Sequence, residues 1–280
     1  MNQSVLQGMP ARLWRCTPTK LTTWLDCPRR FRFAYLEKRP KARVWAHISM
    51  GNSVHNALRD WWSQPFEGRT AATAIDLVTH GWIEQGFRDE DQSTSWRRRA
   101  AEMTAEYVKT LDPGVEPVVV ERTVSTTTEH LALTGRVDRI DAVLDDEGQR
   151  SLVIVDYKTG RGSPTEDDVR GSLALAVYAV CATRTLRSPC TQVELHHLPT
   201  STVVGWSHTR ETLARHLDRA EEIAAEAQAA ETIWRGGDDR PELTPTRPGP
   251  LCAWCDHRSV CPQGQAVSVD LEPWAGLRDD

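Results

Sequence analysis

An aspartate and a lysine stand two residues apart at the end of an apolar run. Residues 152–155 (LVIV) precede Asp156, and Lys158 follows after one residue. A short run rich in β-branched residues predicts a buried strand, in which side chains two residues apart point to the same side. A second acid, Asp138, lies 18 residues earlier in another predicted strand. Two carboxylates and a lysine are the groups that metal-assisted phosphodiester hydrolysis requires, because carboxylates bind hard divalent cations and a lysine orients water or neutralises charge.

Three cysteines near the end of the chain form a metal-binding pattern. Cys252, Cys255 and Cys261 are spaced Cys-x2-Cys-x5-Cys, and a proline follows the last of them. A tetrahedral site needs a fourth ligand, and Cys27, which also precedes a proline, is the best candidate. Zinc and an iron–sulfur cluster both accept four thiolates, so the spacing leaves both open, with His257 as an alternative zinc ligand. The remaining cysteines are isolated and are predicted to be small buried side chains: Cys16, Cys181 and Cys190.

Positive charge is concentrated near the start of a chain whose net charge is -5. Between Arg12 and Arg43, ten basic residues stand against two acids, so this segment carries +8 and the remainder -13. Within it, Arg29, Arg30 and Arg32 alternate with aromatic residues, a pattern that suits backbone contacts and base stacking on nucleic acid. The alternative is an amphipathic helix with a solvated basic face.

The hydrophobic pattern predicts a scaffold that changes from helices to strands. Residues 19–111 are expected to form a helical region, with His55 in the first turns of a helix capped by Asn52 or Ser53. A lone histidine there is more often structural than a ligand. A core is expected over 115–235, and a linker with a cysteine-rich segment over 236–280. Strands are predicted at 117–124, 131–143, 151–157, 192–198 and 202–207, and helices at 165–183 and 211–234. This order predicts a single α/β domain over 1–280 with a central mixed sheet.

The composition is typical of a globular protein and not of a membrane-spanning one. With 39% hydrophobic and 26% charged residues, the chain has the balance of a globular protein. It shows neither an apolar run of membrane-spanning length nor the start of a signal peptide, so we expect a cytoplasmic protein. The absence of a P-loop favours a nuclease without its own helicase motor.

Five motifs, taken in order, resemble those of one nuclease family. They are residues 21–31 (LTTWLDCPRRF), 51–55 (GNSVH), 135–141 (GRVDRID), 156–160 (DYKTG) and the last three cysteines. Together they resemble the RecB-like branch of the PD-(D/E)XK nucleases. More narrowly, they are similar to exonucleases that carry a four-cysteine 4Fe–4S cluster, as in the AddB subunit and the CRISPR-associated RecB-type nucleases. The resemblance implies a restriction-endonuclease-like core with a helical N-terminal region and a C-terminal cysteine-rich clasp.

The resemblance also implies roles for individual residues. It makes His55, Asp138 and Asp156 ligands of Mg²⁺ or Mn²⁺, joined by the carbonyl of Tyr157. It makes Lys158 the catalytic lysine, with Tyr178 on the helix that follows. It favours 4Fe–4S over zinc at the four cysteines. The implied activity is an exonuclease on single-stranded or frayed DNA ends in repair or recombination, with a helicase or repair complex as a candidate partner.

One position departs from the family pattern, and one further acid belongs to none of the motifs. The family usually carries Gln-x3-Tyr on the helix after the lysine strand, but Ala174 stands four residues before Tyr178. This change implies weakened activity, a substitute group such as Arg170 or a different substrate geometry. A DNA-binding module with a degenerate site is the alternative function. Glu121 is a further acid on a preceding strand that no motif anchors, and a solvent-facing residue is an equally good interpretation.

Overall fold

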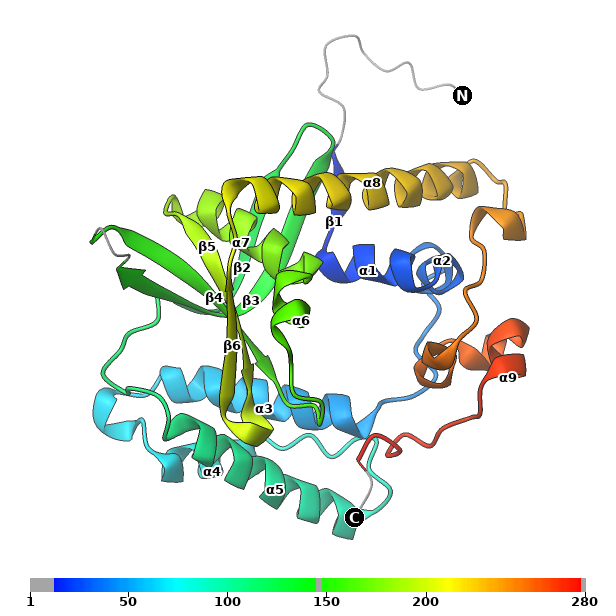
Figure 1. Ribbon diagram of the computed structural model, residues 1–280. Helices are drawn as coiled ribbons and strands as arrows, with labels where there is room; N and C mark the ends of the chain where they lie inside the picture. Colours follow the sequence, from blue (N-terminus) through cyan, green and yellow to red (C-terminus); the bar gives the residue numbers. More distant parts are fainter. Residues whose placement is uncertain (1–12, 145–147, 278–280) are drawn as a thin grey trace.

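A computed structural model describes residues 13–144 and 148–277 of the chain (Figure 1). A mixed sheet forms its centre, with β3 as the strand on which three neighbours pair. The sheet runs β1-β3-β4-β5-β6, and β2 pairs antiparallel with β3 outside this path. The β4–β5 pairing is parallel, and the β3–β4 and β5–β6 pairings are antiparallel. The strands are β1 (Trp14–Cys16), β2 (Val119–Thr127), β3 (Leu131–Leu144), β4 (Arg150–Lys158), β5 (Cys190–His197) and β6 (Thr202–Ser207).

Helices cover both faces of the sheet (Figure 1). One layer holds α1 (Pro18–Asp26), α2 (Pro28–Phe31), α6 (Glu166–Arg170), α7 (Leu173–Leu186) and α8 (Arg210–Arg235). The other holds α3 (Ala46–Trp62), α4 (Ala71–His80) and α5 (Glu90–Val108), and α9 (Pro262–Val267) lies apart with the cysteines. This arrangement confirms the predicted α/β fold with a mixed sheet between helices.

Each face of the sheet has its own hydrophobic core, and β4 contributes to both. Leu152 and Ile154 lie in the core on the side of α7, whereas Val153 and Val155 lie in the core on the side of α3. A strand buried on both faces reads as a continuous apolar run, which explains the sequence before Asp156. We call these the α7-side core and the α3-side core.

Several predicted boundaries were wrong. β1 was not expected, because only three residues form it and its pairing with β3 comes from a distant part of the chain. The helix of the histidine motif begins at Ala46 instead of near Asn52, so His55 lies in its middle. The predicted helix 165–183 is broken into α6 and α7, because Ser172 caps a new helix through Leu175. The turn predicted at 145–148 lies largely outside the described residues.

The helix of the histidine motif contains a glycine for a steric reason. Gly51 lies inside α3, and a Cβ at this position would be 3.3 Å from the hydroxyl of Thr159. The loop after β4 therefore approaches α3 closely at this point, which brings the end of the strand that carries Lys158 to the helix that carries His55. Within the described residues, no helix is both long and apolar enough to cross a membrane.

Candidate active site

Sheet register places three carboxylates side by side on neighbouring strands. Val120 pairs with Arg139 and Arg122 with Val137, so Glu121 of β2 stands opposite Asp138 of β3. On the other side of β3, Arg139 pairs with Val155, and the same register one residue further places Asp156 of β4 opposite Asp138. Directly opposite residues of an antiparallel pair have Cβ atoms about 5 Å apart. A row of acids across three strands is therefore built into the pairing of the sheet.

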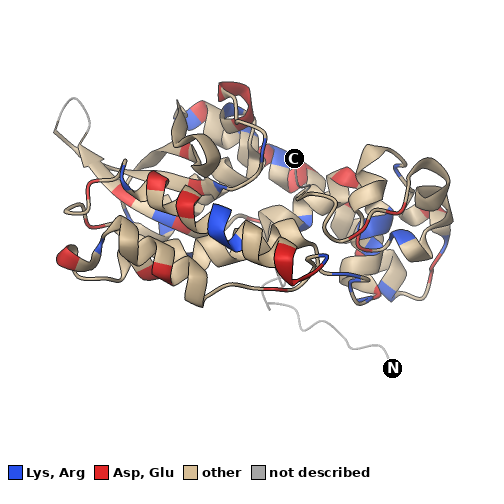
Figure 2. Ribbon diagram, turned by 90° about the horizontal axis from the view of Figure 1, so that it is seen from below, with Lys and Arg blue, Asp and Glu red and all other residues tan. Residues whose placement is uncertain are grey.

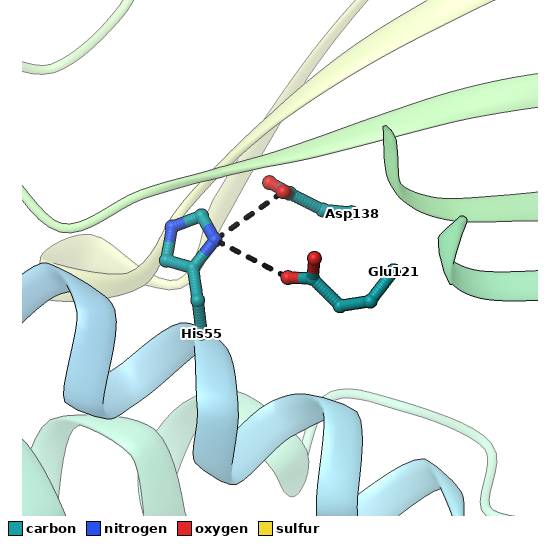
Figure 3. A group of neighbouring side chains, drawn as sticks. All are labelled: His55, Glu121 and Asp138. Atoms are coloured by element: carbon teal, nitrogen blue, oxygen red, sulfur yellow. Dashed lines mark ion pairs between the residues drawn. The ribbon is translucent and has the colours of Figure 1, made fainter. Parts of the chain in front are cut away.

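His55 completes this row from the helix layer (Figure 3). Its Nδ1 atom lies 3.3 Å from Oδ1 of Asp138 and 3.9 Å from Oε1 of Glu121. The three residues each offer one ligand atom, and these atoms lie within 4.8 Å of one another. One imidazole nitrogen and two carboxylates in this arrangement form a donor set that fits a divalent cation.

Glu121 holds a backbone conformation that a glutamate rarely adopts. Its φ is 48°, in the left-handed region, where side chains other than glycine and asparagine are strained. The paired strand β3 also loses its regular alternation of side chains at this level. Odd-numbered Leu133 and Val137 lie in the same α7-side core as even-numbered Ile140. The strain therefore belongs to a local shift in the sheet that brings Glu121 and Asp138 to the ligand group. The sequence did not anchor Glu121, although the short turn between β2 and β3 fixes the register that places it opposite Asp138.

Unbalanced negative charge shifts the pKa values of the site. Burial raises the pKa of Glu121, and the carboxylate of Asp138 raises it further. Burial and the charge of Asp138 likewise raise the pKa of Asp156, although Lys158 opposes the shift. Burial lowers the pKa of the His55 imidazole, but the hydrogen bond and charge of Asp138 outweigh burial and raise it overall. A divalent cation among these groups would relieve the repulsion that causes the shifts.

Asp156 and Lys158 contact each other, as their spacing predicted. The Lys158 ammonium forms an ion pair with Oδ2 of Asp156, and 47% of the lysine side chain remains exposed. Asp156 lies outside the 4.8 Å group, in which Glu121 takes the place that the sequence gave to Asp156. The backbone N–H of Tyr157 donates a hydrogen bond of 2.9 Å to Oδ2 of Asp138, which ties β4 to β3 at the site.

The ring of Tyr157 has a structural role on the opposite side of β4. Its hydroxyl accepts hydrogen bonds from Trp62 Nε1 at 3.2 Å and from Arg139 Nη1 at 3.0 Å. Arg139 also forms an ion pair of 2.9 Å with Asp141. This buried network holds β4 in place at Tyr157, the residue whose backbone carbonyl is predicted to bind the metal ion.

Tyr178 lies against the backbone of Gly135. A Cβ at Gly135 would be 2.2 Å from Cε1 of Tyr178, so only glycine admits the ring. Burial raises the pKa of Tyr178 to about 12, and the charges of Asp156 and Asp138 add to the effect. The phenol is therefore protonated at neutral pH and available as a donor near the carboxylates. The glycine of the 135–141 motif is explained by this contact.

The place of the missing glutamine is not taken by Arg170. Its guanidinium donates to Oδ1 of Asp167 at 2.6 Å and lies 5.5 Å above the ring of Trp206. These partners hold the side chain on the surface of α6. Ala174 thus has no arginine substitute of the kind that the sequence suggested.

The four predicted cluster cysteines line one cavity. Cys27 comes from the junction of α1 and α2, and the clasp, which we define as residues 250–261, supplies Cys252, Cys255 and Cys261. The cavity measures about 140 Å³. Four thiolates around one zinc ion at about 2.3 Å lie about 3.8 Å apart. Among the described residues, no three of these sulfurs lie within 4.8 Å of one another.

The other cysteines and His257 stay away from this cavity. Cys16, Cys181 and Cys190 are buried in the α7-side core, which confirms their predicted role as small buried side chains. Burial raises the pKa of Cys16 to about 11. The buried ring of His257 packs edge-on against Phe33 at 5.7 Å and does not line the cavity.

The three arginines predicted to bind DNA have protein partners. Arg29 donates to the carbonyl oxygens of Thr244 and Pro241, both at 2.9 Å. Arg32 donates to the carbonyl of Asp239 at 2.6 Å and pairs with Glu37 at 2.5 Å. Arg30 lines the cysteine cavity and lies 3.6 Å from Asp26. These contacts fasten the linker to α2, and DNA binding by the three residues stays a prediction.

Comparison with known proteins gives the family. A family model for the PD-(D/E)XK nuclease superfamily matches residues 15–262, which is most of the chain. The chain belongs to the PD-(D/E)XK nuclease superfamily. The superfamily supports nuclease activity, DNA as the substrate and a divalent metal as the cofactor. In this PD-(D/E)XK chain, the nuclease site would lie at the row of acids and Lys158.

Two solved structures are similar to the chain in arrangement. One is a predicted exonuclease from Eubacterium rectale, with 11% identity, a TM-score of 0.47, and coverage of 77% of this chain and 80% of that chain. The other is the protein SSO0001, with 13% identity, a TM-score of 0.37, and coverage of 89% and 85%. No curated protein sequence matches the chain at a significant level.

Proposed function

We propose that this chain is a metal-dependent deoxyribonuclease that acts as an exonuclease on single-stranded or frayed DNA ends. The observation that carries the proposal is the row of Glu121, Asp138 and Asp156 on three adjacent strands, with Lys158 beside it and His55 above it. A role in repair or recombination, with a helicase or repair complex as partner, is consistent with the resemblance of the motifs.

The roles follow from the positions of the groups. His55, Asp138 and Asp156, the carbonyl of Tyr157 and additionally Glu121 would hold Mg²⁺ or Mn²⁺. The bound ion supplies an activated water and stabilises charge on the phosphate. Lys158 is half exposed and next to Asp156, so its ammonium can orient the water or neutralise an oxygen of the phosphate. The phenol of Tyr178, which stays protonated near Asp156 and Asp138, can donate a hydrogen bond to the substrate.

We further propose that Cys27, Cys252, Cys255 and Cys261 bind a 4Fe–4S cluster. Four thiolates accept either a cluster or one zinc ion, and the resemblance of the motifs favours the cluster. A cluster there would join positions 225 residues apart and hold the clasp and the helical region in a single nuclease domain. Anaerobically purified protein is expected to be brown and to contain iron, whereas colourless protein with stoichiometric zinc would contradict this assignment.

Cleavage of end-labelled DNA tests the main proposal. Wild type with Mn²⁺ is expected to shorten a labelled single strand progressively, and Lys158→Ala is expected to be slower by about 10²–10³-fold, the size of effect for one electrostatic donor. Lys109→Ala is the matched control, because Lys109 lies on the surface of α5's C-terminal end and pairs with Glu106. Equal degradation by wild type and Lys158→Ala would sink the proposal.

A DNA-binding module with a degenerate nuclease site is the second candidate. Ala174, in place of the family glutamine, is the observation that favours it. In that case the protein would bind labelled DNA without shortening it in Mg²⁺ or Mn²⁺. Ala174→Gln would then be expected to restore cleavage, because the rest of the row of acids is in place.

A further inference from the structure

A groove leads away from His55 along the exposed side of α3. It has a volume of about 490 Å³, and its lining includes His47, Ile48, Asn52, His55, Arg136 and Thr159. His47, Ile48, Asn52 and His55 follow one another at helical spacing, so they form one continuous face of α3. The groove thus joins the metal-binding end of the sheet to the N-terminal end of α3.

The far end of this groove meets the cysteine clasp. Trp254 stands between Cys252 and Cys255, and its ring packs edge-on against His47 at 5.5 Å and in a tilted arrangement against Trp45 at 5.2 Å. Trp254 remains 39% exposed and Ile48 remains 42% exposed, so an apolar surface is open at this end. Figure 1 shows the clasp beside the N-terminal end of α3, which agrees with these contacts.

Hydrogen bonds hold the residues that pack around Trp254. Trp45 Nε1 donates to Oδ1 of Asp256 at 2.9 Å, and the Ala42 N–H donates to the carbonyl of Asp256 at 3.2 Å. Lys41 lies 3.6 Å from the same carboxylate. An exposed indole held on a rigid support loses little conformational freedom when a flat ring stacks on it.

The two ends of the groove differ in chemistry. At the metal end, Arg136 pairs with Glu121 at 2.5 Å through Nε, and because 65% of its side chain is exposed, the rest of the guanidinium can contact a phosphate. At the clasp end, Trp254 and Ile48 present apolar surface. A basic group followed by an aromatic platform suits a single strand of nucleic acid, whose phosphates and bases are both exposed. Within a duplex the base faces are stacked on one another and cannot reach an indole.

We propose that this groove holds unpaired DNA next to the cleaved phosphate and that Trp254 of the clasp stacks on one of its bases. The inference rests on the proposed nuclease function and adds a residue that determines preference for unpaired DNA. Ile48 lies seven residues from His55, which is about 10 Å along a helix. The stacked base is therefore expected to lie a few nucleotides away from the metal site and not at the cleaved bond itself.

Binding without cleavage tests the inference separately from catalysis. In a Lys158→Ala background with EDTA, fluorescence anisotropy of a labelled 12-nucleotide single strand is expected to show binding about tenfold weaker for Trp254→Leu, as for the loss of one stacked base. Trp254→Phe is expected to retain most of the affinity. Phe66→Leu is the matched control, since Phe66 is an aromatic residue with 57% exposure outside the groove. The affinity of Trp254→Leu for a blunt duplex is expected to differ from that of the parent protein by less than twofold.

Photocrosslinking gives a second readout that does not depend on a variant's folding. A single strand with 5-iododeoxyuridine at successive positions is expected to crosslink to Trp254 at one or two positions a few nucleotides from the cleaved bond. Crosslinks confined to other residues, or unchanged single-strand affinity in a folded Trp254→Leu protein, would overturn the proposal. If cleavage depends on Lys158 while Trp254 has no effect, the nuclease assignment stands and the groove assignment fails.

Discussion

The acidic site and the cysteine cavity both gather metal-binding residues, but the fold prepares them differently. Glu121, Asp138 and Asp156 lie on three paired strands, and backbone hydrogen bonds hold them together whether or not an ion is present. The cysteines lie at a helix junction and in short turns, where no sheet pairing holds them together. Folding alone brings the three carboxylates together, although they repel one another. The four cysteines would be held rigidly only when they bind a metal centre.

Because of this difference, we expect substitutions in the acidic site to change mainly activity and substitutions in the cysteine cavity to change mainly stability. Loss of a ligand in the acidic site is expected to affect catalysis while it relieves charge repulsion in the folded state. Loss of a ligand in the cysteine cavity is expected to affect the attachment of the chain ends. Figure 2 shows both basic and acidic positions in the lobe formed by the N-terminal helices and the clasp.

Asp156→Asn gives the largest expected effect on activity. Cleavage of labelled DNA in Mn²⁺ is expected to fall by about 10³-fold, because a ligand and the partner of Lys158 are both lost. Burial raises the pKa of Asp156, so its ionisation destabilises the folded protein above the ordinary aspartate pKa. In EDTA the variant is therefore expected to melt at a higher Tm than wild type at pH 7, with a difference that vanishes as the pH falls below about 3.9. A lower Tm at pH 7 would contradict this sign.

Cys255→Ser is expected to lower stability more than any change in the acidic site. Loss of one cysteine ligand is expected to prevent the cluster from linking Cys27 to Cys252, which are 225 residues apart. Closure of so long a loop contributes about 3–5 kcal/mol to the free energy of unfolding. At about 2–4 °C per kcal/mol, the Tm is expected to fall by about 6–20 °C. Differential scanning calorimetry with iron analysis measures both effects. Cys190→Ala is the control, because Cys190 is buried away from the cavity and its loss should leave the iron content unchanged.

Gly135→Ala tests the contact that positions Tyr178. The added methyl group would overlap the tyrosine ring, so we expect a loss of about 1–3 kcal/mol in the free energy of unfolding. Activity is expected to fall about tenfold as the ring is displaced. The double variant Gly135→Ala with Tyr178→Leu is expected to recover much of the stability but not the activity. Additive losses in the double variant would show that the two residues do not interact.

Glu121 gives the smallest effect and tests the strain in the sheet. Asparagine tolerates the left-handed conformation and glutamine does not, so Glu121→Asn is expected to be about 1 kcal/mol more stable than Glu121→Gln. Both variants are expected to cleave DNA more slowly, because each lacks the carboxylate. Urea unfolding in EDTA compares them at equal charge. Equal stability would mean that the backbone relaxes without cost.

Local pattern predicted the parts of the site that lie close together in the sequence. The run before Asp156 identified β4, and the two-residue spacing predicted the contact between Asp156 and Lys158. Motif order predicted the superfamily. Glu121 was not predicted, because its place depends on register and on a left-handed residue that no propensity favours. β1 and the early start of α3 were missed because distant packing, not local pattern, determines them.

The double burial of β4 has a consequence for exchange with solvent. Backbone amides of a central strand covered on both faces open only when the whole domain unfolds, so Val153 to Tyr157 are expected among the slowest amides to exchange for deuterium. The turns of the clasp have few such protections and can open separately. Brief local openings at the chain ends would therefore leave the strand of Asp156 and Lys158 intact, and the acidic site would be the last part of the protein to be lost.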